Sequence, residues 1–202
     1  AAAMAGAAQP EDLDHALAQM GTSQHPIVQQ LQALISLEAE ALPSCTDVTG
    51  FGLLGHLGEM LQTSSPSLQV LLDGSAIPAL PGALKLLKAK HASSLAPANR
   101  RAWSLLDPSQ EQPAKVILAR ADSGFDPEDH KALLELLVDP QTCGPLLLGC
   151  SEAMADALLQ ANDTAWHRIG VVSASRADAA CASAAIPLQA QGPAANLWPA
   201  DL

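Results

Sequence analysis

Short apolar segments alternate irregularly with helical patterns along this 202-residue chain, and that order constrains the fold more than any other feature. Strand patterns occur at residues 67–73, 115–120, 146–148 and 168–172. Helical patterns occur at residues 12–42, 51–62, 84–87, 126–138 and 151–159. The sequence therefore predicts an α+β fold, with a mixed, mostly antiparallel sheet and helices packed on it.

Three parts of the chain differ in character. Residues 1–42 form a helical lead-in, which Gly21 and Pro26 divide into two helices. Residues 43–172 form the domain itself, in which the polar, Pro-rich segment 91–114 has no clear period. Residues 173–202 are rich in Ala and Pro, and we expect a poorly ordered tail after a last strand at 168–172.

Composition excludes several classes of function. The formal net charge of −11 argues against a nucleic-acid partner. The apolar runs are far too short to span a bilayer, so we expect no membrane partner. The four cysteines form no C-x-x-C pair and no zinc pattern, which is typical of reduced thiols in a cytoplasmic protein.

One segment, Gly50-Phe51-Gly52-Leu53-Leu54-Gly55, matches the G-x-G-x-x-G pattern of dinucleotide-binding proteins. A helix follows it, and then a strand that ends in Asp73, which is the expected spacing for an acidic ribose ligand. The preceding segment 43–49 is polar, however, and would make a poor central strand. A dinucleotide-binding enzyme is therefore the least favoured of three hypotheses.

A magnesium–phosphate site suits the same segment better. Asp47 is an isolated carboxylate before a glycine-rich turn, and Mg²⁺ takes one or two carboxylates together with phosphate oxygens. Free N–H groups of residues 50–52, at the start of a helix, could hold those phosphates. The candidate ligands are Thr46, Thr49, Gly50 and Gly52 for a nucleotide and Asp47 for the metal. The alternative is that Asp47 or Thr49 merely caps the helix.

These residues resemble a known family. The segment from Thr46 to His56, TDVTGFGLLGH, is similar to the signature that opens the C-terminal domain of selenophosphate synthetases (selenide, water dikinases). Asp139-Pro140-Gln141-Thr142-Cys143-Gly144 resembles a later loop of that family. Segments 76–83 and 94–100 also look similar, so the resemblance covers roughly residues 40–172.

The resemblance implies a fold like that of aminoimidazole ribonucleotide synthetase and an enzyme that makes selenophosphate from selenide, ATP and water, with AMP and phosphate as co-products. It implies Mg²⁺ and ATP as cofactors and Asp47 as a metal ligand. The catalytic residues would lie in an N-terminal catalytic domain of the same protein, so none is expected in this chain, and residues 1–42 would lead in from that half. A homodimer is a further expectation.

Departures from the family pattern keep a second hypothesis open. Cys143-Gly144-Pro145 stands where the family prefers Ser-Gly-Gly, and Pro145 has no backbone N–H to offer a ligand or a neighbour. The alternative is a stand-alone, non-enzymatic domain that binds a nucleotide or regulates another protein. His56 is expected to make a helix-surface or interdomain contact, and Asn99, Arg100 and Arg101 to lie in a solvated loop.

Overall fold

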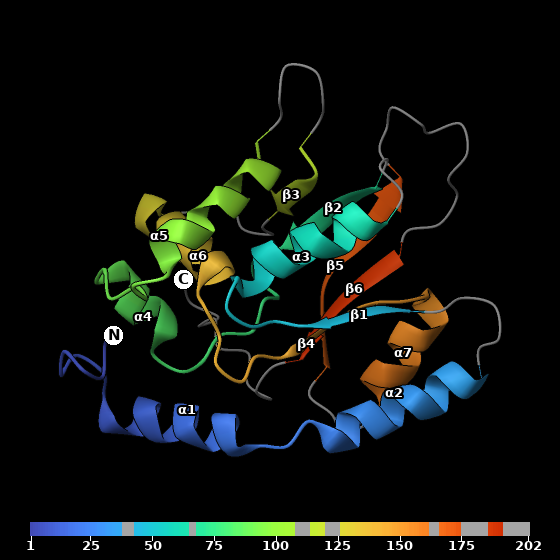
Figure 1. Cartoon of the computed structure of the whole chain (residues 1–202), viewed down its shortest axis with the longest axis horizontal. Helices are drawn as coiled ribbons and strands as arrows, with labels where there is room; N and C mark the ends of the chain where they lie inside the picture. The colour runs from blue at the N-terminus through green and yellow to red at the C-terminus, as the bar shows by residue number, and fades with distance from the viewer. Residues whose placement is uncertain are drawn as a thin grey trace.

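The computed structural model describes residues 1–37, 43–64, 68–107, 114–119, 126–161, 166–174 and 186–191, and it contains a sheet with helices against both faces (Figure 1). The strands are β1 (Ser44–Asp47), β2 (Leu68–Asp73), β3 (Val116–Ala119), β4 (Leu146–Gly149), β5 (Trp166–Ala174) and β6 (Ile186–Gln191). Their order across the sheet is β1-β4-β6-β5-β2-β3. Among the strand pairs that the structure describes, only β2–β3 is parallel, which confirms the predicted mostly antiparallel α+β fold.

The helices match most of the predicted positions. They are α1 (Pro10–Gly21), α2 (His25–Leu37), α3 (Gly52–Thr63), α4 (Ala83–Lys88), α5 (Ala96–Asn99), the 3₁₀ helix η1 (Arg100–Leu105), α6 (Pro127–Val138) and α7 (Glu152–Gln160). Two of these helices begin at a side-chain cap. The Asp126 carboxylate accepts a hydrogen bond from the Glu128 N–H at 3.0 Å, and the Ser151 hydroxyl accepts one from the Met154 N–H at 3.2 Å.

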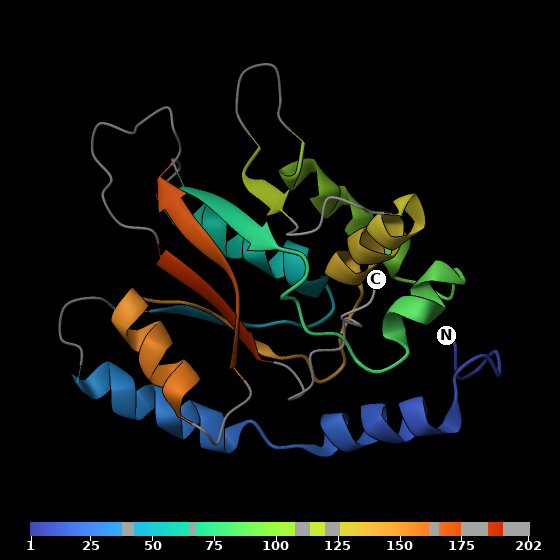
Figure 2. The ribbon, with the colours of Figure 1, turned by 180° about the vertical axis from the view of Figure 1, so that it is seen from behind.

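Two apolar layers hold the helices to the sheet (Figure 2). On one face, α3 and α6 pack against a cluster that includes Leu54, Leu133 and Leu147. On the other face, α2 and α7 pack against a second cluster that includes Leu148 and Leu158. Leu147 and Leu148 are neighbours on β4 and belong to different clusters, because successive side chains of a strand point to opposite faces.

Two predicted irregular segments contain regular structure. Within 91–114 lie α5 and η1, where Ala96 is buried and the Trp103 indole donates a hydrogen bond to the Leu134 carbonyl at 3.1 Å. Beyond 173 lies β6, which pairs with both β4 and β5. The expectation of no strand after 172 is therefore wrong, because β6 lies between β4 and β5 and connects the two halves of the sheet. The other residues of 175–202 lie outside the described part of the chain.

The segment before the glycine-rich turn is a strand that the sequence analysis did not predict. Its four residues form β1, at one edge of the sheet and antiparallel to β4. An edge position suits its polar composition, since most of its side chains meet solvent.

Among the helices that the structure describes, none has the length and apolar character to cross a membrane.

Glycine is required where α3 begins. Gly52 has a φ of +72°, in the left-handed region, and an added Cβ would lie 2.7 Å from the carbonyl carbon of Val138. Gly50 lies two residues earlier, without a positive φ, and a Cβ added there would meet nothing within 4 Å. The start of α3 therefore packs directly on the end of α6, backbone against backbone.

We predict that Gly52→Ala lowers the free energy of unfolding by at least about 2 kcal/mol, because it combines left-handed strain with a backbone clash. Gly50→Ala is the matched control and should change that free energy by about 0.5 kcal/mol or less. Urea denaturation of both variants measures the difference. Equal midpoints for the two variants would contradict this account of the helix start.

Candidate functional site

The predicted site residues lie together in the turn from β1 to α3. Asp47 ends the strand and is exposed, Val48 points into the core, and Thr49 is half-buried. The strand ends at Asp47, so Val48 and Thr49 lie in the turn that leads to α3. Gly50 is exposed at the turn, whereas Gly52 is buried at the helix start, and Thr46 is half-buried on the strand.

A second loop, residues 139–145, forms hydrogen bonds with this turn. The Gln141 N–H donates to the Thr49 carbonyl at 3.0 Å, and the Val48 N–H donates to the Pro145 carbonyl at 2.8 Å. A Cβ on Gly144 would collide with the Val48 carbonyl, so only glycine permits this approach. The two segments that resemble family motifs are thus hydrogen-bonded to each other. We call the contacts between residues 48–52 and 138–145 the turn–loop junction.

Asn99 completes the turn–loop junction from α5. Its buried amide group donates to the Gly50 carbonyl at 2.8 Å and to the Val138 carbonyl at 3.1 Å. The expectation that Asn99 lies in a solvated loop is therefore wrong. The sequence analysis could not identify this role, because both acceptors are backbone groups of distant segments.

The amide groups of the turn differ in their availability. The Gly52 N–H donates to the Thr49 carbonyl at 3.1 Å, so the expectation that it is free for a phosphate is corrected. Within the described residues, the N–H groups of Gly50 and Phe51 donate to no backbone carbonyl. Both precede a helix of 12 residues, whose N-terminus favours an anion. The expected anion contacts therefore reduce to these two amides.

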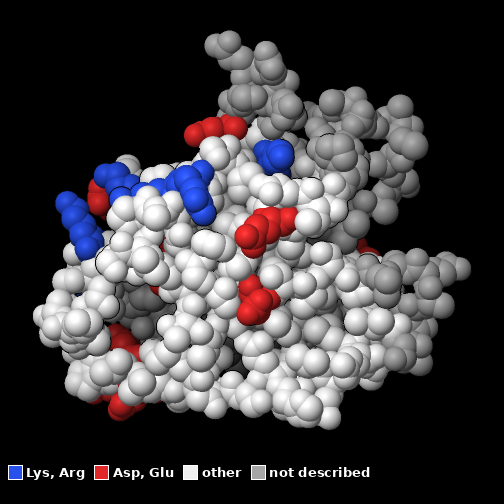
Figure 3. Space-filling view, viewed as in Figure 1, with Lys and Arg blue, Asp and Glu red and all other residues white. Residues whose placement is uncertain are grey.

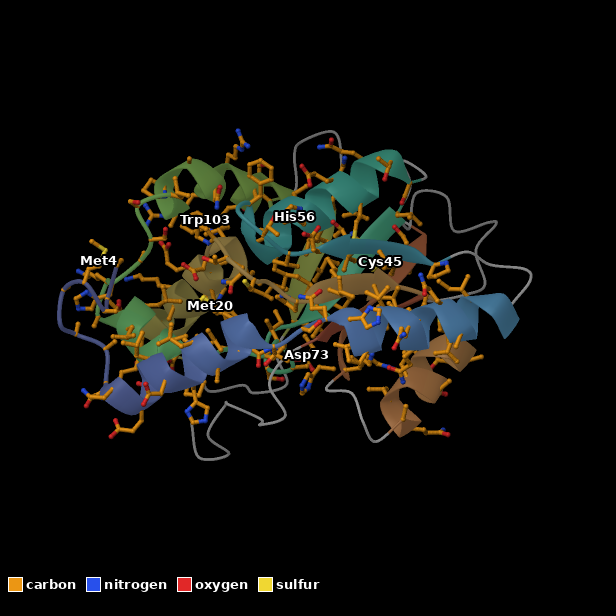
Figure 4. All side chains as sticks on the ribbon, turned by 60° about the horizontal axis from the view of Figure 1, so that its bottom comes forward. Met4, Met20, Cys45, His56, Asp73 and Trp103 are labelled. Atoms are coloured by element: carbon orange, nitrogen blue, oxygen red, sulfur yellow. The ribbon has the colours of Figure 1, made fainter. Side chains whose placement is uncertain are left out.

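The Thr49 hydroxyl has a partner that the sequence analysis missed. It lies 3.1 Å from Nε2 of His56, whose Nδ1 lies 3.0 Å from Oε2 of Glu59. His56 is only 7% exposed, so the expected helix-surface contact is wrong. Figure 4 labels His56 on α3 and Cys45 on the neighbouring strand β1. The signal in the sequence was the i, i+3 spacing of His56 and Glu59 on one helix.

Asp47 fits a metal that takes most of its ligands from elsewhere. It takes part in none of the ion pairs among the described residues, so no described Lys, Arg or His occupies its carboxylate. Those residues contain no group of three or more His, Cys, Asp or Glu that could hold a metal. Mg²⁺ commonly binds one or two carboxylates, substrate phosphates and waters, and this donor set suits that pattern.

Other charged and reactive side chains near the turn are less available to bind a phosphate or to act as a nucleophile. Arg100 pairs with Glu135 at 2.8 Å, while the guanidinium of Arg101 lies 5.8 Å from the ring centre of the exposed Phe51. Lys and Arg side chains gather in Figure 3 over the side of the molecule that carries α4 and α5.

Cys45 is an exposed residue, yet desolvation of its thiol, and then the charge of Asp47, raise the pKa of that thiol. A raised pKa disfavours the thiolate and argues against Cys45 as a nucleophile.

A cavity of about 450 Å³ lies beside the turn–loop junction. Its walls come from α1, from residues 77–83 and from the loop 139–145. Asp139 lines it, and burial raises the pKa of this carboxyl, although a hydrogen bond from the Gln141 amide at 3.1 Å opposes the shift. The Gln24 amide donates to the Gly144 carbonyl and ties the α1–α2 connection to the same loop.

The strand order excludes the dinucleotide-binding hypothesis. In that fold the strand before the glycines is parallel to, and next to, the strand that ends in the acidic residue. Here β1 is an antiparallel edge strand, and three strands separate it from β2, which ends at Asp73. Asp73 instead accepts hydrogen bonds from the backbone and hydroxyl of Ser75.

The raised pKa of Asp139 predicts a pH-dependent stability. The folded state holds the proton more tightly than the unfolded chain, so stability falls as pH rises from the unfolded pKa of about 4 through the folded value. Asp139→Asn should therefore raise the melting temperature at pH 7 by up to about 2–4 °C, with no gain at about pH 3. Thermal melts across this range test it, with Asp14→Asn, an exposed position on α1, as the control. A lower melting temperature at pH 7 would contradict the prediction.

Comparisons with known proteins agree with this geometry. The family model described as "AIR synthase related protein, C-terminal domain" matches residues 4–180. A selenide, water dikinase of Nitratidesulfovibrio vulgaris (strain DP4) is 34% identical over 134 residues, 65% of this chain and 33% of the relative. One of Rhizobium meliloti (strain 1021) is 38% identical over 136 residues, 67% of this chain and 34% of the relative.

The extent of these matches decides what they establish. The chain spans about a third of the length of the curated relatives it matches, so their whole activity does not transfer directly. The family model, in contrast, covers most of the chain, including both segments of the turn–loop junction. The chain therefore belongs to the AIR synthase related family, as its C-terminal domain, among relatives that are selenide, water dikinases.

Proposed function

We propose that this chain is the C-terminal half of a selenide, water dikinase and supplies one wall of a Mg-ATP site. The observation that carries the proposal is Asp47, an exposed carboxylate outside every described ion pair, at the start of the turn that contains the amides of Gly50 and Phe51. This combination offers a metal ligand and an anion contact within one turn. The relatives are named selenide, water dikinases, and the family resemblance of the sequence adds ATP as the phosphoryl donor of the proposed reaction.

The residues of the turn have distinct tasks in this proposal. Mg²⁺, when bound, would neutralise charge on the phosphates that are transferred. Asp47 holds the metal, and the two amides at the start of α3 orient phosphate oxygens. The turn–loop junction keeps the turn rigid, so that the phosphates are positioned before the reaction begins. The selenide-activating residues would come from the N-terminal catalytic domain.

That domain needs a surface on which to dock, and α1 offers one. The helix buries none of its own residues, and its apolar stripe of Leu13, Leu17 and Met20 is exposed. Ala16, Gln19 and Met20, at one edge of that stripe, line the cavity. A stripe at i, i+4 and i+7 is the pattern by which an amphipathic helix packs on a partner. We propose the N-terminal catalytic domain as that partner.

Asp47→Asn should weaken Mg²⁺-dependent binding of ATP by at least about tenfold, because it removes a charged ligand from the metal. Stability should change by no more than about 0.5 kcal/mol, since the carboxylate is exposed. Titration of a fluorescent ATP analogue with and without Mg²⁺ measures the affinity, and Asp14→Asn is the control. An unchanged affinity would exclude Asp47 as the metal ligand.

Leu17→Glu should leave the melting temperature nearly unchanged but abolish association with the N-terminal catalytic domain, because a charge replaces the centre of the apolar stripe. Ala18→Glu, on a different side of the same helix, should do neither. Analytical ultracentrifugation of the mixed halves gives the readout. Equal association by both variants would mean that the apolar stripe of α1 does not contact the N-terminal catalytic domain.

The coding sequence upstream of Ala1 decides between the two remaining hypotheses. If it continues into a Gly-rich segment with a Cys or selenocysteine codon and a nearby Lys, the whole protein should form AMP from ATP only when selenide is present. If no such segment is encoded and no separate partner restores AMP formation, the dikinase proposal fails. The stand-alone binding domain would then be the better account.

A further inference from the structure

We propose that the cavity between α1, residues 77–83 and the loop 139–145 binds a small organic cation, an ammonium group on an apolar body. The proposal goes beyond the function proposed above, since Asp47, Gly50 and Phe51 are not among the residues that line the cavity. Its volume of about 450 Å³ is that of a small-molecule site, for which about 300–1,000 Å³ is usual. The chemistry of the walls selects the class of ligand.

The walls disfavour an anion and suit an apolar body. Among the described side chains that line the cavity there is no Lys, Arg or His, so a phosphate or a carboxylate would meet no cationic side chain there. Apolar groups of Leu53, Ile77 and Leu136 line it, together with Met20 of α1. An apolar ligand body that leaves water for these walls lowers its free energy. The cavity is therefore a poor site for the phosphates of a nucleotide.

Two amide side chains in the walls have their nitrogens engaged and their oxygens left over. The Gln141 amide group donates to the Asp139 carboxylate, and the Gln24 amide group donates to the Gly144 carbonyl. A carboxylate and a carbonyl can only accept, so each amide must face its partner with nitrogen. The remaining amide oxygens are acceptors. A ligand that donates several hydrogen bonds suits such walls, and an ammonium group carries three N–H donors.

Asp139 supplies a negative charge in the wall. Burial raises the pKa of its carboxyl, which means that the charged form is poorly solvated. The terminal ammonium group of Ala1, which also lines the cavity, acts in the opposite direction and lowers that pKa. A cation near Asp139 therefore stabilises its charge, and the ammonium group of a ligand would do the same from inside the cavity.

A bound ligand would connect two parts of the molecule. The helix α1 buries none of its own residues, yet Ala16, Gln19 and Met20 form one wall of the cavity. The loop 139–145, which forms another wall, belongs to the turn–loop junction. Occupancy of the cavity should therefore hold α1 against the junction and raise the melting temperature, since only the folded chain has this site.

The first test compares two probes of nearly the same shape, 4-fluorobenzylamine, which is cationic at pH 7, and neutral 4-fluorobenzyl alcohol. Titrations of the 202-residue chain followed by ¹⁹F NMR should give a Kd of about 1 mM or tighter for the amine. The alcohol should bind at least about tenfold more weakly, because it lacks the charge. Shifts in ¹H–¹⁵N spectra should lie in residues 77–83 and 139–145. Equal affinities, or shifts confined to other surfaces, overturn the proposal.

Variants test the two features of the site separately. Asp139→Asn removes the charge and keeps the shape, so it should weaken binding of the amine at least about tenfold and leave binding of the alcohol unchanged. Asp14→Asn, at an exposed position on α1, is the matched control and should keep the affinity for the amine. Ala16→Phe fills the cavity and should abolish binding of both probes. Thermal melts show that each variant is folded.

Further controls separate a site from attraction to the net charge of −11. Methylammonium has the charge without the apolar body, so it should compete at least about tenfold more weakly than 4-fluorobenzylamine. The chain acetylated at Ala1 should bind the amine at least as tightly, because the competing ammonium group is removed. Equal competition by methylammonium, or full affinity of Asp139→Asn or Ala16→Phe for the amine, overturns the proposal. The absence of binding at about 10 mM amine also overturns it.

Discussion

The turn–loop junction is the contact on which the rest of this structure depends. It brings two backbones so close that Gly52 and Gly144 cannot be replaced without a collision. Close approach lets the polar groups of the turn bond to the polar groups of the loop, and Asn99 satisfies two further carbonyls. The start of α3, the end of α6 and the edge strand β1 therefore meet at one rigid point.

This rigidity matters for the proposed site because the turn carries its ligands. A single carboxylate and two helix-start amides are weak ligands if they move, since each would lose conformational freedom on binding. The junction removes most of that freedom before a ligand arrives. The buried chain from Glu59 through His56 extends the same principle to a side chain, because it fixes which way the Thr49 oxygen faces.

Much of the fold could be predicted because its signals are local. The caps at Asp126 and Ser151 act on N–H groups two or three residues away, and the apolar stripes of α2, α3 and α6 repeat within a few turns. The strands β2, β4 and β5 are short apolar runs that only a buried sheet can accommodate. Segments without such a signal, β1, α5, η1 and β6, were missed, since pairing or packing with distant residues determines them.

The sequence by itself determined the fold class, the position of the glycine-rich turn and the place of Asp47 beside it, because these follow from patterns within a few residues. Only the tertiary structure decided which amides of the turn remain available, that β1 is an edge strand, and that Thr49 is bonded to a buried histidine. The physical reason is that hydrogen bonds between segments far apart in the chain carry no periodic signature. They appear only when packing has brought those segments into contact.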